Sequence, residues 1–373
     1  MKIASIISEY NPFHNGHKYQ IEEARKITGC DGIVALMSGN FVQRGDFAVF
    51  PKEVRAEAVL KCGIDLVLDN PSVCVLRSAE GYAKASVYTL NSLGCIDYLV
   101  FGAEHSNIDD LQKIAEFLAN ENNEYKKKLS ENLSKGVSFA SARGNAVSQY
   151  LGCEAQEILS YPNNLLAIEY LKELIRENSS IKPVLIPRTG TGHNSTITNG
   201  NFASASYIRE NMDNISNFVP ENAYTIYNGL SPVSIKAAEK AIISSLILMS
   251  REQLAETPDI SEGLENKIKK ALEDSNSLEE IFSKVKSKRY AYSRIRRGVL
   301  CAFLGITKEW AGMMPEYIKI LDFNETGQRI LNYAKKHTSI PLIKNASPIL
   351  KNEKAMKLWK KELEFDKLYN IFN

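Results

Sequence analysis

The sequence has few cysteines, and no two of them are closely spaced. Its six cysteines are scattered over 373 residues, and none belongs to a CxxC motif. Zinc modules and disulfide frameworks both depend on regularly spaced cysteines, so this usage argues against either kind of site. Reduced, buried thiols in a cytoplasmic protein fit it better. We therefore predict no metal centre built from the protein's own side chains.

Long hydrophobic runs are also missing. The longest, Ala241–Met249, is bounded by Lys240 and Arg251, whereas a membrane-spanning helix needs about 20 apolar residues. Near the start of the chain, Glu9 and Pro12 interrupt the sequence before the apolar region of a signal peptide could form. We expect a cytoplasmic protein that carries no targeting segment and does not bind a membrane.

A strong excess of charge of one sign is missing as well. The chain has 46 Lys and Arg residues against 44 Asp and Glu residues, a formal net charge of +2. The molecule as a whole is not a polycation, so any surface that binds nucleic acid must be local. The apolar fraction of 44% is enough for hydrophobic cores, and the length is comfortable for two domains.

Short apolar runs alternate with amphipathic segments through the first half of the chain. The runs KIASII, GIVALM, DLVLDN, DYLVFG and IKPVLIPR predict five strands, and helices are predicted between them. One of these helices should begin after Ser78 and end at Gly94. This order predicts an α/β fold, a doubly wound parallel sheet with helices on both faces. Such a sheet binds ligands at the carboxyl ends of its strands.

The texture of the sequence changes beyond about Asn211, where helical patterns dominate. We predict an α/β domain over residues 1–211, with a polar helical insertion at 120–150, and a mainly helical domain over 212–373. Near the end, YIKILDFN, ETGQRILNYAKKH and IPLIKN predict a small strand–helix–strand element within the second domain.

The motif His14-Asn15-Gly16-His17 follows the first predicted strand and opens the first helix. A helix N-terminus presents backbone N–H groups and favours an anion, and Gly16 lets a planar base approach the backbone. His14 and His17 are three residues apart, so they share one face of the first turn. Such a pair can stabilise charge on phosphate oxygens during adenylyl transfer. The alternative is that one histidine caps the helix and the other packs.

The segment ASASYIRE is a second candidate for the phosphate side of a site. Ser204 is a candidate N-cap, and Ser206 and Arg209 would point at phosphates from the first turns of the helix. An ordinary capped helix with a surface arginine is the alternative. The HxGH pattern resembles the nucleotidyltransferase superfamily, and ASASYIRE resembles the ISSTxIR segment of small-molecule adenylyltransferases. No KMSKS loop is seen, which argues against aminoacyl-tRNA synthetases.

Other loops fall where the predicted sheet would place a site, although turn chemistry explains each of them equally well. Gly102 follows the fourth strand and would let an adenosine lie against the backbone. His105 and His193 are more typical of structural or surface histidines. The remaining polar candidates are Asn40, Gln43, Arg44, Asp46, Asn163, Asn164 and Arg188.

Five segments together resemble one family closely: SEYNPFHNGH, SGNFVQRGDFAVFPKEVRAE, FGAEH, PNNLLAIEYL and RYAYSRIRRGVL. They are similar to the tRNA(Met) cytidine acetate ligases, which are HxGH nucleotidyltransferase-like enzymes. The likeness runs from residue 3 to about residue 350, nearly the whole chain. The QRG-containing stretch and the SRIRR segment are much more specific than HxGH itself.

The resemblance implies a Rossmann-like nucleotidyltransferase domain and an ATP-dependent ligase. Such an enzyme activates acetate as acetyl-adenylate and releases pyrophosphate. It then transfers the acetyl group to N4 of the wobble cytidine of elongator tRNA(Met) and releases AMP. The partners implied are ATP with Mg²⁺, acetate and the tRNA, and no protein partner is predicted.

The resemblance also implies which residues bind ATP, with His14 and His17 as the catalytic pair. The choice of Asn163 over Asn164 stays open. The implied residues are Ile7, Ser8, Glu9, Tyr10, Asn11, Pro12, Phe13, His14, Asn15, Gly16, His17, Lys18, Tyr19, Gln20, Gly102, Asn163 and Arg188.

The segment SKVKSKRYAYSRIRR interleaves basic and aromatic residues. Cations for phosphates and rings for unstacked bases are the usual combination for reading RNA, whereas a basic helix face in solvent is the alternative. The predicted tRNA-binding residues are Lys288, Arg289, Arg294, Arg296 and Arg297.

Two other classes of function remain open from the sequence. A small-molecule adenylyltransferase would leave the basic segment without a role. A non-catalytic RNA-binding protein would keep only a relic nucleotide pocket.

Overall fold

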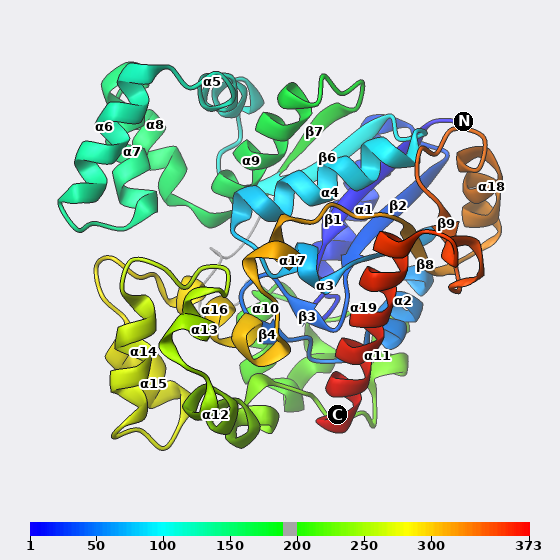
Figure 1. The fold of residues 1–373 in the computed structure, drawn as a ribbon. Coiled ribbons are helices and arrows are strands. Elements are labelled where there is room, and N and C mark those ends of the chain that lie inside the picture. The colour runs from blue at the N-terminus through cyan, green and yellow to red at the C-terminus, as the bar shows by residue number, and fades with distance from the viewer. Residues whose placement is uncertain (189–199) are drawn as a thin grey trace.

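The first half of the chain builds a mostly parallel sheet (Figure 1). This computed structural model describes residues 1–188 and 200–373, and within them seven strands form one sheet in the order β7-β6-β1-β2-β5-β8-β9. The first five strands in this order are parallel, and β8 is antiparallel to β5. All five strands predicted from the apolar runs are confirmed. The bounds are β1 (Ile3–Ser8), β2 (Gly32–Ser38), β5 (Leu66–Asn70), β6 (Tyr98–Ala103), β7 (Lys182–Pro187), β8 (Ile318–Phe323) and β9 (Leu342–Ile343).

Alternate side chains of the strands enter two different cores, as a sheet covered on both faces requires. Ile3 of β1 packs into a core with α4, α5, α9 and α18, whereas Ala4 and Ile6 enter a core with α1, α2 and α11. The predicted double winding is therefore confirmed. The helices of these layers are α1 (Asn15–Thr28), α2 (Lys52–Lys61), α4 (Ala79–Leu93), α5 (Ile108–Ala119), α9 (Pro162–Arg176), α11 (Glu221–Tyr227) and α18 (Glu325–Ala334).

Helix α4 begins and ends at the predicted residues. The Ser78 side chain accepts a hydrogen bond from the backbone N–H of Gly81, and Gly94 stops the helix with a φ of +71°. A Cβ at Gly94 would lie 2.4 Å from the carbonyl oxygen of His337. Glycine is needed here both for its backbone conformation and for the close approach of a C-terminal segment.

The predicted boundary at residue 211 does not separate the sheet from the later helices. The strand–helix–strand element over Ile318–Ile343 joins the sheet itself, because β8 pairs with β5. A Cβ at Gly327 of α18 would lie 2.0 Å from the carbonyl oxygen of Asp65, so helix and sheet are in direct contact. This pairing covers a strand that would otherwise be an exposed edge, which is its physical reason. Local sequence patterns carry no information about such a distant partner.

The remaining helices form two groups (Figure 1). The predicted insertion at 120–150 extends to Ser160, as α6 (Asn123–Ser134), α7 (Phe139–Leu151) and α8 (Cys153–Ser160). A second group packs around its own core with a short hairpin, β3 (Phe41–Val42) and β4 (Asp46–Phe47). Its helices are α3 (Ser72–Val75), α12 (Glu239–Leu248), α13 (Arg251–Ala255), α14 (Leu264–Leu272), α15 (Leu278–Val285), α16 (Tyr292–Leu304), α17 (Lys308–Gly312) and α19 (Glu353–Ile371). The short α10 (Ala205–Glu210) comes between β7 and α11 in the sequence.

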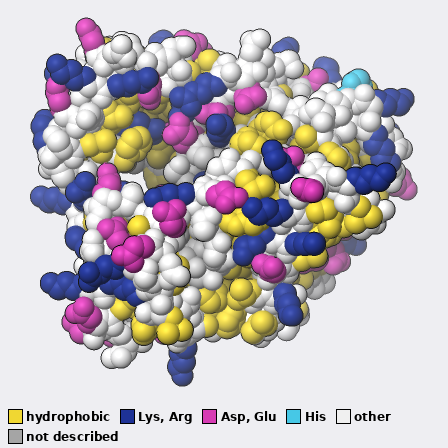
Figure 2. Space-filling view, viewed as in Figure 1, with side chains coloured by type: hydrophobic (Ala, Val, Ile, Leu, Met, Phe, Trp, Pro, Cys, Tyr) yellow, Lys and Arg dark blue, Asp and Glu magenta, His cyan; other side chains and the backbone are white. Residues whose placement is uncertain are grey.

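The mixed charge of the surface agrees with the small net charge of the sequence, and the helices agree with its short apolar runs. On the face drawn in Figure 2, Lys and Arg side chains are interspersed with Asp and Glu, and no large field of one sign forms. Among the described residues, no helix is both long and apolar enough to cross a bilayer.

Candidate active site

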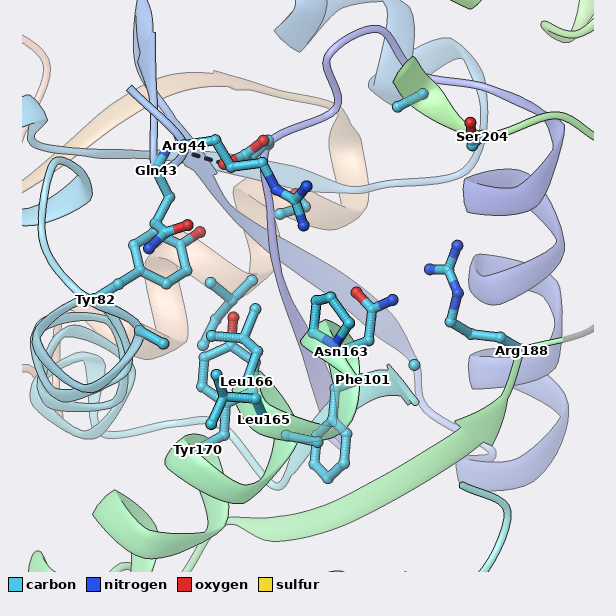
Figure 3. Close-up of a pocket in the computed structure, with 18 of the residues that line it drawn as sticks. Gln43, Arg44, Tyr82, Phe101, Asn163, Leu165, Leu166, Tyr170, Arg188 and Ser204 are labelled. Carbon is cyan, nitrogen blue, oxygen red and sulfur yellow. Dashed lines mark hydrogen bonds between the residues drawn. The ribbon is translucent and has the colours of Figure 1, made fainter. Parts of the chain in front are cut away.

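A cavity of about 860 Å³ opens at the carboxyl end of β1 (Figure 3). After β1 the chain moves through β2 to β5 on one side, and it returns to place β6 and then β7 on the other side. The cavity therefore lies at the point where the strand order reverses, which is where open α/β sheets bind ligands. Its volume lies within the usual range for small-molecule sites, about 300–1,000 Å³.

The two histidines of the HNGH motif begin α1 and also line this cavity. The backbone N–H of Gly16 donates to His14 Nδ1 at 3.1 Å, and the backbone N–H of His14 donates to His17 Nδ1 at 3.3 Å. The two rings stack with their centroids 3.7 Å apart. Each histidine therefore takes part in capping the helix and also lines the cavity, so the two interpretations do not exclude each other.

Both imidazoles are electrically neutral at physiological pH. Burial lowers the pKa of His14 to about 3, and the charges of Arg188 and Arg209 add to this effect. Burial also lowers the pKa of His17 well below its usual range, with His14 and Arg188 contributing. Since each Nδ1 accepts a hydrogen bond, the single ring proton belongs on Nε2. The site therefore offers two uncharged N–H donors.

Of the three phosphate-side candidates in ASASYIRE, only Ser204 lines the cavity. Ser204 caps α10, accepting a hydrogen bond from Tyr207 N at 3.1 Å, and it lines the cavity. Ser206 and Arg209 are not among the described residues that line the cavity. Arg209 donates to the carbonyl oxygen of Asn11 at 2.7 Å and to Ser206 Oγ at 3.3 Å, so it supports the loop that leads to the histidines.

The choice between Asn163 and Asn164 has a geometric answer. Asn163 lines the cavity, and its side-chain amide donates to Glu104 Oε1 at 2.6 Å (Figure 3). Asn164 is buried outside the main cavity. Its Oδ1 accepts from the backbone N–H of His105 and its Nδ2 donates to the carbonyl oxygen of Ile158. Asn164 therefore holds a loop in place, whereas Asn163 is the one of the two that lines this cavity.

The remaining predicted ATP-binding residues are only partly brought to the cavity. Gly102 and Arg188 line it at the ends of β6 and β7, and a Cβ at Gly102 would lie 3.4 Å from Arg188 Cγ. The cavity is not lined by Pro12, Phe13, Asn15 or Lys18. The stretch from 7 to 20 contributes Ile7, Ser8, Glu9, Tyr10, Asn11, His14, Gly16, His17, Tyr19 and Gln20.

Comparison with known proteins places the chain in a family. The model of the HIGH nucleotidyl transferase family matches residues 1–373. The chain is 42% identical to the tRNA(Met) cytidine acetate ligase of Clostridium novyi, over 92% of this chain and 89% of that protein. It is 39% identical to the ligase of a Thermoanaerobacter species, over 100% of this chain and 95% of that protein. The chain belongs to the tRNA(Met) cytidine acetate ligase family.

Solved structures from this ligase family agree with the fold. The crystal structure of apo Thermotoga maritima TmcAL superposes with a TM-score of 0.94 at 32% identity, covering 100% of this chain and 95% of that one. A second structure of TmcAL, bound with alpha-thio ATP, superposes with a TM-score of 0.92 at the same identity and coverage. The predicted family and fold class are confirmed.

One wall of the cavity was not predicted from the sequence. Tyr82 of α4 and Tyr170 of α9 line it, together with Phe101, Leu165 and Leu166 (Figure 3). Burial raises the pKa of both tyrosines above the usual range, so their hydroxyls stay protonated. These residues lie on helices whose apolar pattern indicates only core packing, and no local feature marks them as ligand contacts.

The loop after β2, which carries the ligase family's QRG segment, serves two purposes. Gln43 and Arg44 line the cavity, opposite Arg188 and Ser204 (Figure 3). Asn40 instead accepts from the backbone N–H of Lys52 and donates to Asp366, so its role is structural. Asp46 is likewise structural because it pairs with Arg296, as described below. His105 is structural too, since it contacts Asp110 at 3.0 Å, and His193 lies outside the described residues.

The three arginines of the SRIRR segment do not form an open basic face, because each is paired within the protein, and their contact with tRNA stays a prediction. Arg297 is buried, pairs with Asp259 at 2.7 Å and reaches the cavity. Arg296 pairs with Asp46 at 2.5 Å. Arg294 donates to the 259–262 loop, including Glu262 Oε2 at 3.1 Å. Of the predicted tRNA contacts, only Lys288 and Arg289 are exposed.

Proposed function

We propose that this protein acetylates N4 of the wobble cytidine of elongator tRNA(Met) in the cytoplasm, using ATP and acetate. In the first step an acetate oxygen attacks the α-phosphorus of ATP. The bond to pyrophosphate breaks and acetyl-adenylate forms. The observation that carries the proposal is the pair of neutral Nε2–H donors at the end of β1, which can follow the charge that develops on the α-phosphate oxygens.

The nucleotide would lie on the side of the cavity formed by β6, β7 and α10. There Gly102 leaves the backbone open, Asn163 offers an amide, and Arg188 and Ser204 face the phosphates. Among the described residues, no group of three or more His, Cys, Asp or Glu side chains could hold a metal ion. A Mg²⁺ ion would therefore be held mainly by the phosphate oxygens of ATP, which is how Mg²⁺ often binds.

In the second step N4 of the cytidine attacks the acetyl carbonyl carbon, and AMP leaves. No cysteine is found among the described residues that line the cavity, so direct attack on the adenylate is the simplest scheme. Holding the weakly nucleophilic amine beside the mixed anhydride can supply much of the barrier lowering.

The decisive experiment incubates the protein with ATP, acetate and tRNA(Met) and analyses the digested nucleosides by mass spectrometry. N4-acetylcytidine should appear at position 34 only when all three substrates are present. Exchange of labelled pyrophosphate into ATP that depends on acetate tests the first step. A small-molecule adenylyltransferase would show no acetate dependence, and a non-catalytic RNA-binding protein would give no exchange under any condition.

Acyl selectivity gives a further prediction. Tyr82, Phe101 and Tyr170 give the cavity an aromatic wall, and a site for a two-carbon acid must be small. One methylene in an apolar pocket changes selectivity by only about 10–200-fold. We expect propionate to be used at a kcat/KM lower than that of acetate by a factor in this range, measured by pyrophosphate exchange. Equal use of butyrate would argue against a dedicated acetate pocket.

The tRNA surface should include the exposed part of the basic segment. Lys288 and Arg289 are exposed, although Arg289 also lies 3.8 Å from Glu262. The ammonium group of Lys267 covers the Tyr290 ring at 5.1 Å. We expect Lys288→Ala/Arg289→Ala to weaken tRNA binding and to reduce the salt slope by about 0.7–0.9 per lost phosphate contact. Acetate-dependent pyrophosphate exchange should stay intact.

The matched control for this prediction is Lys335→Ala/Lys336→Ala, which removes two exposed lysines after α18. Tight tRNA binding with an unchanged salt slope is expected for this pair. If instead only Lys335→Ala/Lys336→Ala weakened tRNA binding, the tRNA surface would lie near the end of α18.

A further inference from the structure

The cavity has a single acidic side chain among the described residues that line it, Glu9. We infer that Glu9 is the general base that removes a proton from cytidine N4 in the second step, an assignment that rests on the function proposed above. A role for Glu9 in the chemistry is additional to its place in the nucleotide-binding stretch.

The acetyl transfer releases a proton that must have a destination. The N4 lone pair forms the new C–N bond, the bond from the acetyl carbon to the phosphate oxygen breaks, and AMP leaves with that electron pair. The nitrogen, initially NH₂, must lose one proton to become the amide N–H of N4-acetylcytidine. In our scheme this proton moves to Glu9 Oε2, and it passes to solvent after the product leaves. A base positioned for such a transfer contributes about 10²–10⁴-fold.

The other polar side chains of the cavity are unsuited to accept this proton. In His14 and His17 the Nδ1 lone pairs already accept backbone hydrogen bonds, and the Nε2 atoms carry hydrogen. The hydroxyls of Tyr82 and Tyr170 are protonated donors. The remaining charged residues of the described lining are arginines, which have no acceptor atom: Arg44, Arg188 and Arg297.

The position of Glu9 is fixed on both its backbone and its side chain. Arg55, which is fully buried, donates to the carbonyl oxygen of Glu9 at 2.6 Å. The backbone N–H of Gln43 donates to Glu9 Oε1 at 2.9 Å. Within the described part of the chain no hydrogen bond is donated to Oε2. One carboxylate oxygen is thus held by the QRG loop, and the other is left for a substrate proton.

Glu9 also lies on the loop that connects β1 to the histidines of α1. It is the residue that follows β1, five residues before His14 at the start of α1. Its bond to Gln43 ties it to the wall opposite Arg188 and Ser204 (Figure 3). Glu9, His14 and His17 line the same cavity. In our scheme the histidines hold the α-phosphate of acetyl-adenylate there, and Glu9 accepts the proton of the attacking N4.

The test is Glu9→Gln, in which the amide oxygen can still accept the hydrogen bond from Gln43 N. The second step is isolated by supplying synthetic acetyl-adenylate with tRNA(Met) in a single turnover and measuring N4-acetylcytidine. The first step is isolated as acetate-dependent pyrophosphate exchange, with a tRNA(Met) transcript that carries uridine at the wobble position. We expect transfer to slow by about 10²–10⁴-fold and exchange to change by less than about threefold.

The matched control is Glu22→Gln on α1, whose side chain is 62% exposed and which should behave like the unchanged protein in both assays. Equal loss of both steps in Glu9→Gln, at an unchanged melting temperature, would show that Glu9 positions the loop or the nucleotide and would overturn the assignment. Normal transfer would overturn it too and would point to a phosphate oxygen of the adenylate as the base. If the unchanged protein itself gave neither exchange nor product, the proposed function would fail before Glu9 came into question.

Discussion

Replacing His17 with alanine should slow acetyl-adenylate formation by about 10²–10³-fold, the typical cost of losing one preorganised donor to a developing oxyanion. His17 is neutral, and its Nδ1 is occupied by the backbone N–H of His14, so its Nε2–H is the group that faces a substrate. The loss should appear in kcat of acetate-dependent pyrophosphate exchange. Affinity for tRNA should change little, because Lys288 and Arg289 lie in the loop between α15 and α16 and do not line the cavity.

The dual role of His17 calls for a variant that separates capping from chemistry. In His17→Asn the side-chain oxygen can still accept from the backbone N–H of His14, so the helix start is kept while the Nε2–H is lost. We expect this variant to match the unchanged protein in melting temperature and His17→Ala in rate. A fast His17→Asn enzyme would assign the whole effect to the cap. His14→Ala should be comparably slow, and the double variant should lose less than the product of the two single losses.

Much of the site could be predicted because its sequence features are local. The first strand and the helix start at His14 lie close together in the sequence, and the cap at Ser204 depends only on the residues next to it. Periodicity and capping act over such short ranges, so both features could be predicted. The alternation of strands and helices then fixed the sheet and the edge at which the cavity opens. The family resemblance added the substrates, which no local pattern contains.

The features that could not be predicted depend on residues far apart in the chain. The SRIRR arginines look like a basic face in the sequence, but the partner of Arg296 is Asp46, 250 residues away. The aromatic wall of Tyr82 and Tyr170 carries the pattern of ordinary core helices, which is why it was not recognised. The pairing of β8 with β5 also joins segments that lie far apart in the sequence. Each case is decided by tertiary packing, on which periodicity gives no information.

A buried ion cluster joins the C-terminal helix to the sheet and gives the largest expected effect on stability. Lys52 of α2 is 1% exposed, and its ammonium group contacts Asp69 of β5 at 3.0 Å and Asp366 of α19 at 2.6 Å. Burial by itself lowers the pKa of Lys52, but the two carboxylates raise it overall, so the residue stays charged. Lys319 of β8 contributes more distant contacts, at 3.5 Å and 3.7 Å.

Removing the central cation should destabilise the whole molecule, because Lys52→Ala leaves two carboxylates close together and poorly solvated. Breaking a buried pair in this way typically costs about 3–5 kcal/mol, and denaturant unfolding should show a drop of this size in the free energy of unfolding. Lys319→Met is the matched control. It leaves both Lys52 contacts in place and should cost about 1 kcal/mol, the value of a peripheral pair. A Lys52→Ala protein within about 1 kcal/mol of the unchanged one would mean that water or a solvent cation replaces the ammonium group. In that case α19 would be held by its apolar side chains, Leu358, Phe365 and Tyr369, and not by the ion cluster.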